Sequence, residues 1–166
     1  MIPIVVYSNK IGLNQNSHFL IWLKKSVDPS ITIATDGVPH QALEAEFPII
    51  NKNDAIKVRN SVAFCFSDGP LKLMRETTAA RRVVYVNTMP NLYLVNSATK
   101  RQFIRDLAQT CADYIVFPTA SGIYKQLEEK IPDSTKIVVC NPYCNEQDWV
   151  SFFKSVKKEV ETIAKM

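Results

Sequence analysis

The amino-acid sequence predicts a three-layer α/β domain, in which a mostly parallel β-sheet is covered by helices on both faces. Short runs of β-branched and aromatic residues recur along the chain, and most are followed by a turn signal and a helical pattern. These runs are continuously apolar rather than alternating, which is typical of strands buried on both faces of a parallel sheet. We therefore expect a single Rossmann-like domain over residues 1–166, with about six or seven strands.

The first half of the chain contains four of the predicted strands. They are Ile4–Tyr7, Ile31–Ala34, Phe47–Ile50 and Val62–Phe66. Pro48 restricts the third of them to a strand start or a sheet edge, because proline has no backbone N–H. A helix through Phe19–Leu23 is expected between the first two strands, and Pro70 is well placed in the first turn of a helix that contains Leu71 and Met74.

The second half contains three further strands, Val83–Val86, Tyr114–Phe117 and Ile137–Cys140. A helix precedes the second of these, with an apolar face formed by Phe103, Ile104, Leu107 and Cys111. After the second strand, Ser121 can cap a helix that holds Ile123, Tyr124, Leu127 and Ile131.

The last predicted helix, Asp148–Met166, has a broad apolar stripe along one face. The stripe consists of Trp149, Phe152, Phe153, Val156, Val160 and Ile163. We expect the helix to pack on the sheet of its own chain. The alternative is that the aromatic residues of the stripe bind a protein partner, which requires Trp149 and Phe152 to be exposed.

The cysteine spacing does not indicate a metal site. Cys65, Cys111, Cys140 and Cys144 form no CxxC pair, and no histidine lies near them to complete a zinc set. Cys65 and Cys140 lie inside apolar runs, where a reduced thiol behaves as a small hydrophobic group. The sequence shows neither a signal-peptide pattern nor a stretch long enough to span a membrane, so we expect a reduced, cytoplasmic protein.

The familiar nucleotide-binding motifs are missing. The chain has only 4 glycines and contains neither a GxGxxG nor a GxxxxGK[ST] sequence, so it predicts no cofactor. No pair of carboxylates converges by sequence, which leaves the catalytic residues unknown and the question of an enzyme open. Asp68 is either a base or a turn residue bonded to its own backbone, and His18 and His40 are either site residues or surface residues, the second interpretation being favoured in each case.

Ligands of such folds bind beyond the carboxyl ends of the strands, near the switch in strand order. The polar residues that follow the expected strands are therefore the candidate ligand-binding residues. They are Ser8, Asn9, Lys10, Asn87, Thr88, Thr119 and Ser121. The last four can donate hydrogen bonds to sugar hydroxyls, or they can cap the helices that follow.

Two segments, Ala112–Gly122 and Lys136–Asn145, resemble the closing strands of the N-terminal, acceptor-side domain of GT-B-type glycosyltransferases. The seven-strand pattern is similar to that domain, and the last helix resembles the family's helix that crosses back onto it. The resemblance implies that the loops around Ser8–Lys10, Asn87–Met89 and Thr119–Gly122 face an acceptor.

The sequence departs from the family pattern in three ways, the first being that the glycine-rich turn after the first strand is reduced to Gly12. Asn87 stands where many family members have a histidine, and the chain ends where their donor-binding C-terminal domain begins. These departures imply either a binding or assembly module, or the acceptor half of a split glycosyltransferase that needs a donor-domain partner chain. Fold alone does not decide between them.

A basic segment suggests a different function. Residues 70–112 carry seven of the Lys and Arg residues but only two acidic ones: Lys72, Arg75, Arg81, Arg82, Lys100, Arg101 and Arg105 against Glu76 and Asp106. Such an excess is typical of a solvated face and also of a surface that binds nucleic acid or another polyanion. Few aromatic residues lie between these cations to stack on bases, so nucleic-acid binding is the alternative interpretation.

Overall fold

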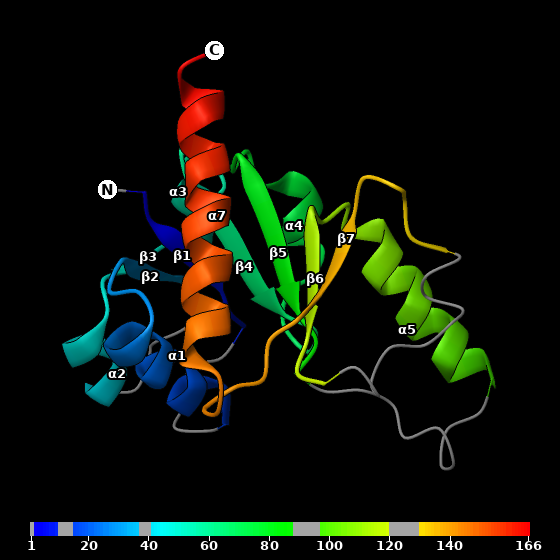
Figure 1. The fold of residues 1–166 in the computed structure, drawn as a ribbon, viewed down its shortest axis with the longest axis horizontal. Coiled ribbons are helices and arrows are strands. Elements are labelled where there is room, and N and C mark those ends of the chain that lie inside the picture. Colours follow the sequence, from blue (N-terminus) through cyan, green and yellow to red (C-terminus); the bar gives the residue numbers. More distant parts are fainter. Residues whose placement is uncertain (1, 10–14, 37–40, 88–96, 120–129) are drawn as a thin grey trace.

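A parallel sheet lies at the centre of the molecule, with helices on both of its faces (Figure 1). The computed structural model describes residues 2–9, 15–36, 41–87, 97–119 and 130–166. Within these residues the sheet has seven strands: β1 (Ile4–Tyr7), β2 (Ile31–Ala34), β3 (Ile49–Ile50), β4 (Val62–Phe66), β5 (Arg81–Tyr85), β6 (Tyr114–Phe117) and β7 (Lys136–Val139). The predicted three-layer, Rossmann-like α/β fold is confirmed.

The helices divide between the two faces of the sheet. They are α1 (Gln15–Ser26), α2 (Gln41–Glu46), α3 (Lys52–Ala55), α4 (Leu73–Glu76), α5 (Ser97–Gln109) and α7 (Glu146–Ala164). Apolar residues of α1, α2 and α7 belong to one core cluster, and those of α3, α4 and α5 belong to another on the opposite face. The continuous apolar runs are explained by this arrangement, because Ile4 and Val6 enter the first cluster while Val5 and Tyr7 enter the second.

The strand order places a topological switch between β1 and β4. The order is β3-β2-β1-β4-β5-β6-β7, and every neighbouring pair is parallel. From β1 the chain builds outward through β2 to β3 and then returns to the other side of β1 to form β4. Connections leave β1 and β4 in opposite directions, which opens a crevice at their carboxyl ends.

Most strand predictions agree with the structure to within two residues. β3 is a two-residue edge strand that begins directly after Pro48, as the proline predicts. β5 begins at Arg81, two residues earlier than expected, because the whole length of β4 pairs with it and Val62 lies opposite Arg81. The apolar pattern missed this start because both of its first two residues are arginines. The short helices α2 and α3 were also not expected.

The prediction for Cys111 is wrong. We expected it on the apolar face of the helix, but α5 ends at Gln109 and Cys111 is exposed, with φ of 54°. A residue in the left-handed region ends a helix and lets the chain turn toward the next strand, which here is β6. The helix expected over Ile123–Ile131 and its cap at Ser121 lie outside the described residues, except for the last two positions.

The aromatic stripe of α7 is buried within its own chain. Trp149 is 0% and Phe152 8% exposed, and the Trp149 indole N–H donates a hydrogen bond to the Asn141 carbonyl oxygen at 3.2 Å. The ring centroid of Trp149 lies 5.2 Å from that of Phe19 on α1 and 5.3 Å from that of Tyr85 on β5. The exposure that a partner surface on this stripe requires is therefore absent.

Cys65 and Cys140 are buried and free, as predicted. In the described part of the chain, no helix combines the length and the hydropathy needed to span a bilayer. The same residues contain no group of three or more His, Cys, Asp or Glu side chains that could hold a metal ion.

Candidate functional site

A cavity of about 340 Å³ opens at the switch point, where β1 and β4 end. We call it the switch-point cavity. It is lined by Tyr7, Ser8, Asn9, Asn16, Phe66, Asp68 and Gly69. β1 and the residues after it supply one wall, the turn after β4 supplies another, and the first turn of α1 supplies Asn16. The cavity thus lies where a ligand of such a sheet is expected.

A chain of side-chain hydrogen bonds joins three segments beside this cavity. The Asn87 amide group donates to Asn16 Oδ1 at 2.7 Å, and the Asn16 amide group donates to Asp68 Oδ1 at 3.1 Å. At the other end, the Ser67 hydroxyl donates to Asn87 Oδ1 at 2.9 Å. Because each asparagine both donates and accepts, the orientations of the two amides are fixed relative to the Asp68 carboxylate.

A second polar group borders the cavity on the β2 side. Lys52 Nζ donates a hydrogen bond to Asn9 Oδ1 at 3.1 Å and lies 3.9 Å from Asp36 Oδ2. The Lys52 side chain is only 12% exposed, so its ammonium group is held near the carboxyl end of β1 rather than free in solvent. The site therefore combines amide, hydroxyl, carboxylate and ammonium groups.

The Tyr7 phenol and the Cys65 thiol are buried near the switch-point cavity, and neither provides a nucleophile at neutral pH. Burial raises the pKa of the Tyr7 phenol, although a hydrogen bond with Thr77 partly offsets it; the two oxygens are 3.0 Å apart. Burial also raises the pKa of the Cys65 thiol far above its usual range, and the negative charge of Asp68 adds to this effect. A thiol is nucleophilic only as the thiolate, so Cys65 is inert. The arrangement is suited to hydrogen bonding.

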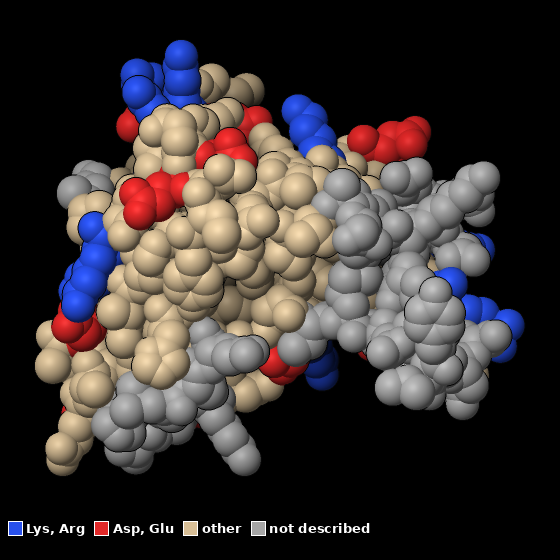
Figure 2. All heavy atoms as spheres, turned by 60° about the horizontal axis from the view of Figure 1, so that its bottom comes forward, with Lys and Arg blue, Asp and Glu red and all other residues tan. Residues whose placement is uncertain are grey.

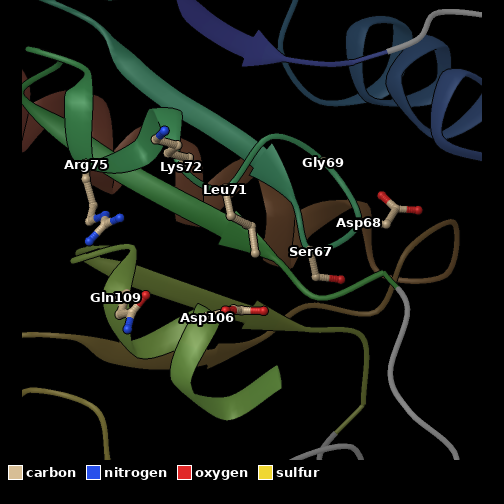
Figure 3. A pocket seen from close by; sticks show the side chains of 8 residues that line it. All are labelled: Ser67, Asp68, Gly69, Leu71, Lys72, Arg75, Asp106 and Gln109. Atoms are coloured by element: carbon tan, nitrogen blue, oxygen red, sulfur yellow. The ribbon is translucent and has the colours of Figure 1, made fainter. Parts of the chain in front are cut away.

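A second cavity of about 400 Å³ lies on the other side of the turn after β4 (Figure 3). We call it the α4–α5 cavity. Its lining consists of Ser67, Asp68, Gly69, Leu71, Lys72, Arg75, Asp106 and Gln109. Figure 3 shows Arg75 extending toward Gln109, and Leu71 toward Asp106. The two cavities share Asp68 and Gly69, so the turn forms the partition between them.

The partition is tight at Gly69. The Gly69 N–H donates to the Phe66 carbonyl oxygen at 2.9 Å, which closes the turn directly after β4. A Cβ atom at this position would lie 3.0 Å from Cys65 Sγ and 3.1 Å from the Phe66 carbonyl oxygen. Glycine therefore allows the turn to fold back onto the end of its own strand.

The structure brings some of the predicted ligand-binding residues together. Ser8 and Asn9 line the switch-point cavity, and Asn87 borders it through its hydrogen bond to Asn16. Thr119 is exposed beyond β6 and lines neither cavity. Lys10, Thr88, Ser121 and His40 lie outside the described residues. For the seven candidate ligand-binding residues, a role in ligand binding remains a prediction.

Sequence reasoning missed Asn16 and Lys52, and it favoured a turn residue at Asp68, which does lie in the turn after β4. The Asp68 carboxylate accepts a hydrogen bond from Asn16, which is 52 positions away in the sequence. Only the loop position of Asp68 pointed to the site, because it directly follows a predicted strand. His18 is exposed on α1 and lines neither cavity.

Not all cations of the basic segment are free to bind a polyanion. Arg81 Nε lies 3.5 Å from Glu159 Oε2, and the Arg82 guanidinium donates to the Thr77 carbonyl oxygen at 2.9 Å. Both arginines begin β5, at the amino ends of the strands, and both are partly buried, whereas Lys72 and Arg75 are exposed. Figure 2 brings the carboxyl ends of the strands forward; its described Lys and Arg side chains lie mostly at the margins of this view.

Comparisons of the chain with protein-family models, with curated proteins and with solved structures found no match.

Proposed function

We propose that the chain binds a sugar or a similarly polyhydroxylated small molecule in the switch-point cavity. The observation that carries this proposal is the hydrogen-bonded chain Ser67–Asn87–Asn16–Asp68, which fixes amide and carboxylate groups at the wall of a cavity of about 340 Å³. Sugar hydroxyls both donate and accept hydrogen bonds, so fixed groups of both kinds suit them.

Asp68 and Asn9 are the proposed direct contacts. The side chains of both are exposed at the cavity, and the second carboxylate oxygen of Asp68 has no bonded partner among the described residues. It can accept from a ligand hydroxyl, and a hydrogen bond to a charged group is stronger than a neutral one. Asn16 and Asn87 are positioning residues, because they hold the Asp68 carboxylate in place.

The proposal has two forms, according to whether the bound sugar reacts. In the first, the chain is a binding or assembly module. In the second, suggested by the resemblance to GT-B acceptor domains, it holds the acceptor of a split glycosyltransferase whose donor-binding domain is a separate chain.

The test is a thermal-shift and calorimetric screen against hexoses, nucleotide-sugars, free nucleotides and short nucleic acids. A ligand present at about 100 times its Kd should stabilise the fold by about 2.7 kcal/mol. Asn16→Ala should weaken sugar binding about ten-fold, because it removes the hydrogen bonds that hold Asp68 and Asn87.

Asn60→Ala is the matched control, since Asn60 is exposed and lies two residues before β4, near the amino ends of the strands rather than their carboxyl ends. It should leave sugar binding unchanged. The proposal fails if no sugar or nucleotide-sugar binds, or if the two asparagine variants behave alike. A shift with nucleic acid alone would instead favour the polyanion-binding alternative.

A further inference from the structure

Two cations of the α4–α5 cavity have no partner in the described part of the chain. Lys72 and Arg75 both line this cavity and are exposed, and neither side chain takes part in a hydrogen bond or ion pair there. Three less exposed cations of the chain are paired: Lys52 with Asn9, Arg81 with Glu159 and Lys157 with Asp28. The unpaired charges are therefore available to a ligand.

The two cations lie on the same wall of the cavity. Lys72 immediately precedes α4 in helical backbone conformation, and Arg75 follows three residues later. Residues at this spacing are neighbours on one helical face. An anion of the size of a phosphate can contact both, and an arginine guanidinium matches two of its oxygens at once.

The carboxylates that line the cavity are engaged elsewhere. Asp106 accepts a hydrogen bond from the Gln102 side-chain amide at 2.7 Å, one turn back on α5. Asp68 accepts from Asn16 on the side of the switch-point cavity. Neither carboxylate lies within ion-pair distance of Lys72 or Arg75, so the positive wall keeps its charge.

We infer that the ligand is a phosphate monoester of a sugar-like molecule, with its phosphate bound by Lys72 and Arg75 in the α4–α5 cavity. This rests on the proposed function, because the hydroxylated part of the same molecule occupies the switch-point cavity. Asp68 and Gly69 line both cavities, so the two cavities adjoin at this turn. A phosphate monoester is close to a dianion at neutral pH, which two cations neutralise.

The experiment is calorimetry on the full chain at low salt, with glucose, galactose and mannose, the 1-phosphate and 6-phosphate of each, and inorganic phosphate. At least one ester should bind about ten-fold tighter than its parent sugar. The double variant Lys72→Gln/Arg75→Gln should lose this gain and still bind the parent sugar. Lys154→Gln/Lys158→Gln removes the same charge from exposed positions on α7 and should keep the gain.

Asp106→Asn should change the affinity for the ester in the opposite direction. It removes a negative charge from the same cavity and should tighten binding of the ester without changing that of the parent sugar. A change of fold alone would not produce an increase for the ester only.

The outcomes separate the two proposals. If parent sugars bind but no ester binds more tightly, or if the double variant keeps the gain, the phosphate assignment is wrong and the proposed function stands. If no sugar or ester binds, the proposed function fails, and the assignment of a phosphate monoester as the ligand fails with it. In that case, titration with inorganic phosphate tests the anion site by itself. A saturable NMR shift of the Arg75 side-chain signal that Lys72→Gln weakens supports an anion site at these residues, and the absence of a shift overturns it.

Discussion

The two faces of the sheet are built differently. On the face covered by α1 and α7, large aromatic side chains fill the space, with Phe19 stacked on Tyr85 at 4.9 Å and Trp149 on Phe153 at 6.0 Å between centroids. On the opposite face, the strands present small side chains such as Ala63 and Cys65. The four-residue helices α3 and α4 cover part of this face. Aromatic packing thus concentrates on one face, and the α4–α5 cavity opens on the other.

The largest expected loss of stability is on the face covered by α1 and α7, which we call the aromatic face. Trp149→Ala should lower the free energy of unfolding by about 3–5 kcal/mol, because it leaves a cavity among fully buried rings. It also removes the indole hydrogen bond to the Asn141 carbonyl oxygen. Urea denaturation followed by circular dichroism measures this change.

Met74→Ala is the matched substitution on the opposite face. Met74 is also fully buried, but it lies on the four-residue helix α4. We expect a loss of about 2 kcal/mol, since a short helix can shift to fill part of the space. A loss equal to or larger than that of Trp149→Ala would show that the two faces contribute alike to the stability of the fold. The contrast drawn between the two faces would then be wrong.

The layers of the fold could be predicted because its strands are buried on both faces. Ile4–Tyr7, Val62–Phe66 and Tyr114–Phe117 are apolar throughout, so their bounds could be placed to the residue. The pattern was incomplete where charged residues enter a strand. Arg81 and Arg82 pair with Val62 and Ala63, but their side chains conceal the start of β5 from an apolar pattern.

The candidate site could be predicted only in part, because it depends on strand order. Ser8, Asn9 and Asn87 were identified from their positions after strands. The contact between Asn16 and Asn87 spans 71 positions in the sequence and exists because β1 lies beside β4 and β4 beside β5. Apolar periodicity predicts that strands exist but does not show which strands are neighbours in the sheet. Nothing in the sequence pattern therefore indicated that Asn16 belongs to the site.

The next expected loss of stability comes from a salt bridge at the rim of the aromatic face. Lys157 Nζ on α7 lies 2.6 Å from Asp28 Oδ2, just after α1, and the side chains are 17% and 15% exposed. Burial alone would raise the pKa of the Asp28 carboxyl, but hydrogen bonds from Lys157 and Ser30 outweigh it and leave the pKa below its ordinary value. Asp28→Asn should therefore cost about 2 kcal/mol at pH 7.

The pH dependence of this loss follows from the direction of the shift. A lowered pKa in the folded state contributes stability above the ordinary carboxyl pKa of about 4, and this contribution is lost as the pH falls through the folded value. Urea midpoints of the two proteins should therefore converge between pH 7 and pH 2. A constant difference would show that Asp28 acts through packing. Asp133→Asn, at an exposed position, is the control.

The smallest expected change in stability is at the partition between the two cavities. Gly69→Ala should cost about 1 kcal/mol, because its Cβ meets Cys65 Sγ and the Phe66 carbonyl oxygen and the turn must shift. A shifted turn moves Asp68 as well, so sugar binding should weaken more than stability falls. Calorimetry and urea denaturation of the same preparation measure the two effects.

A double-mutant cycle separates crowding from other causes. Cys65→Ala removes the sulfur that the new Cβ would meet at 3.0 Å. If crowding against the thiol displaces the turn, Cys65→Ala/Gly69→Ala should be more stable than the sum of the single changes predicts, by about 0.5 kcal/mol or more, and should recover part of the lost binding. Strict additivity would mean that the Phe66 carbonyl oxygen alone restricts this position. In that case the turn is held by backbone contacts, and the small side chains of this face do not set the shape of the cavities.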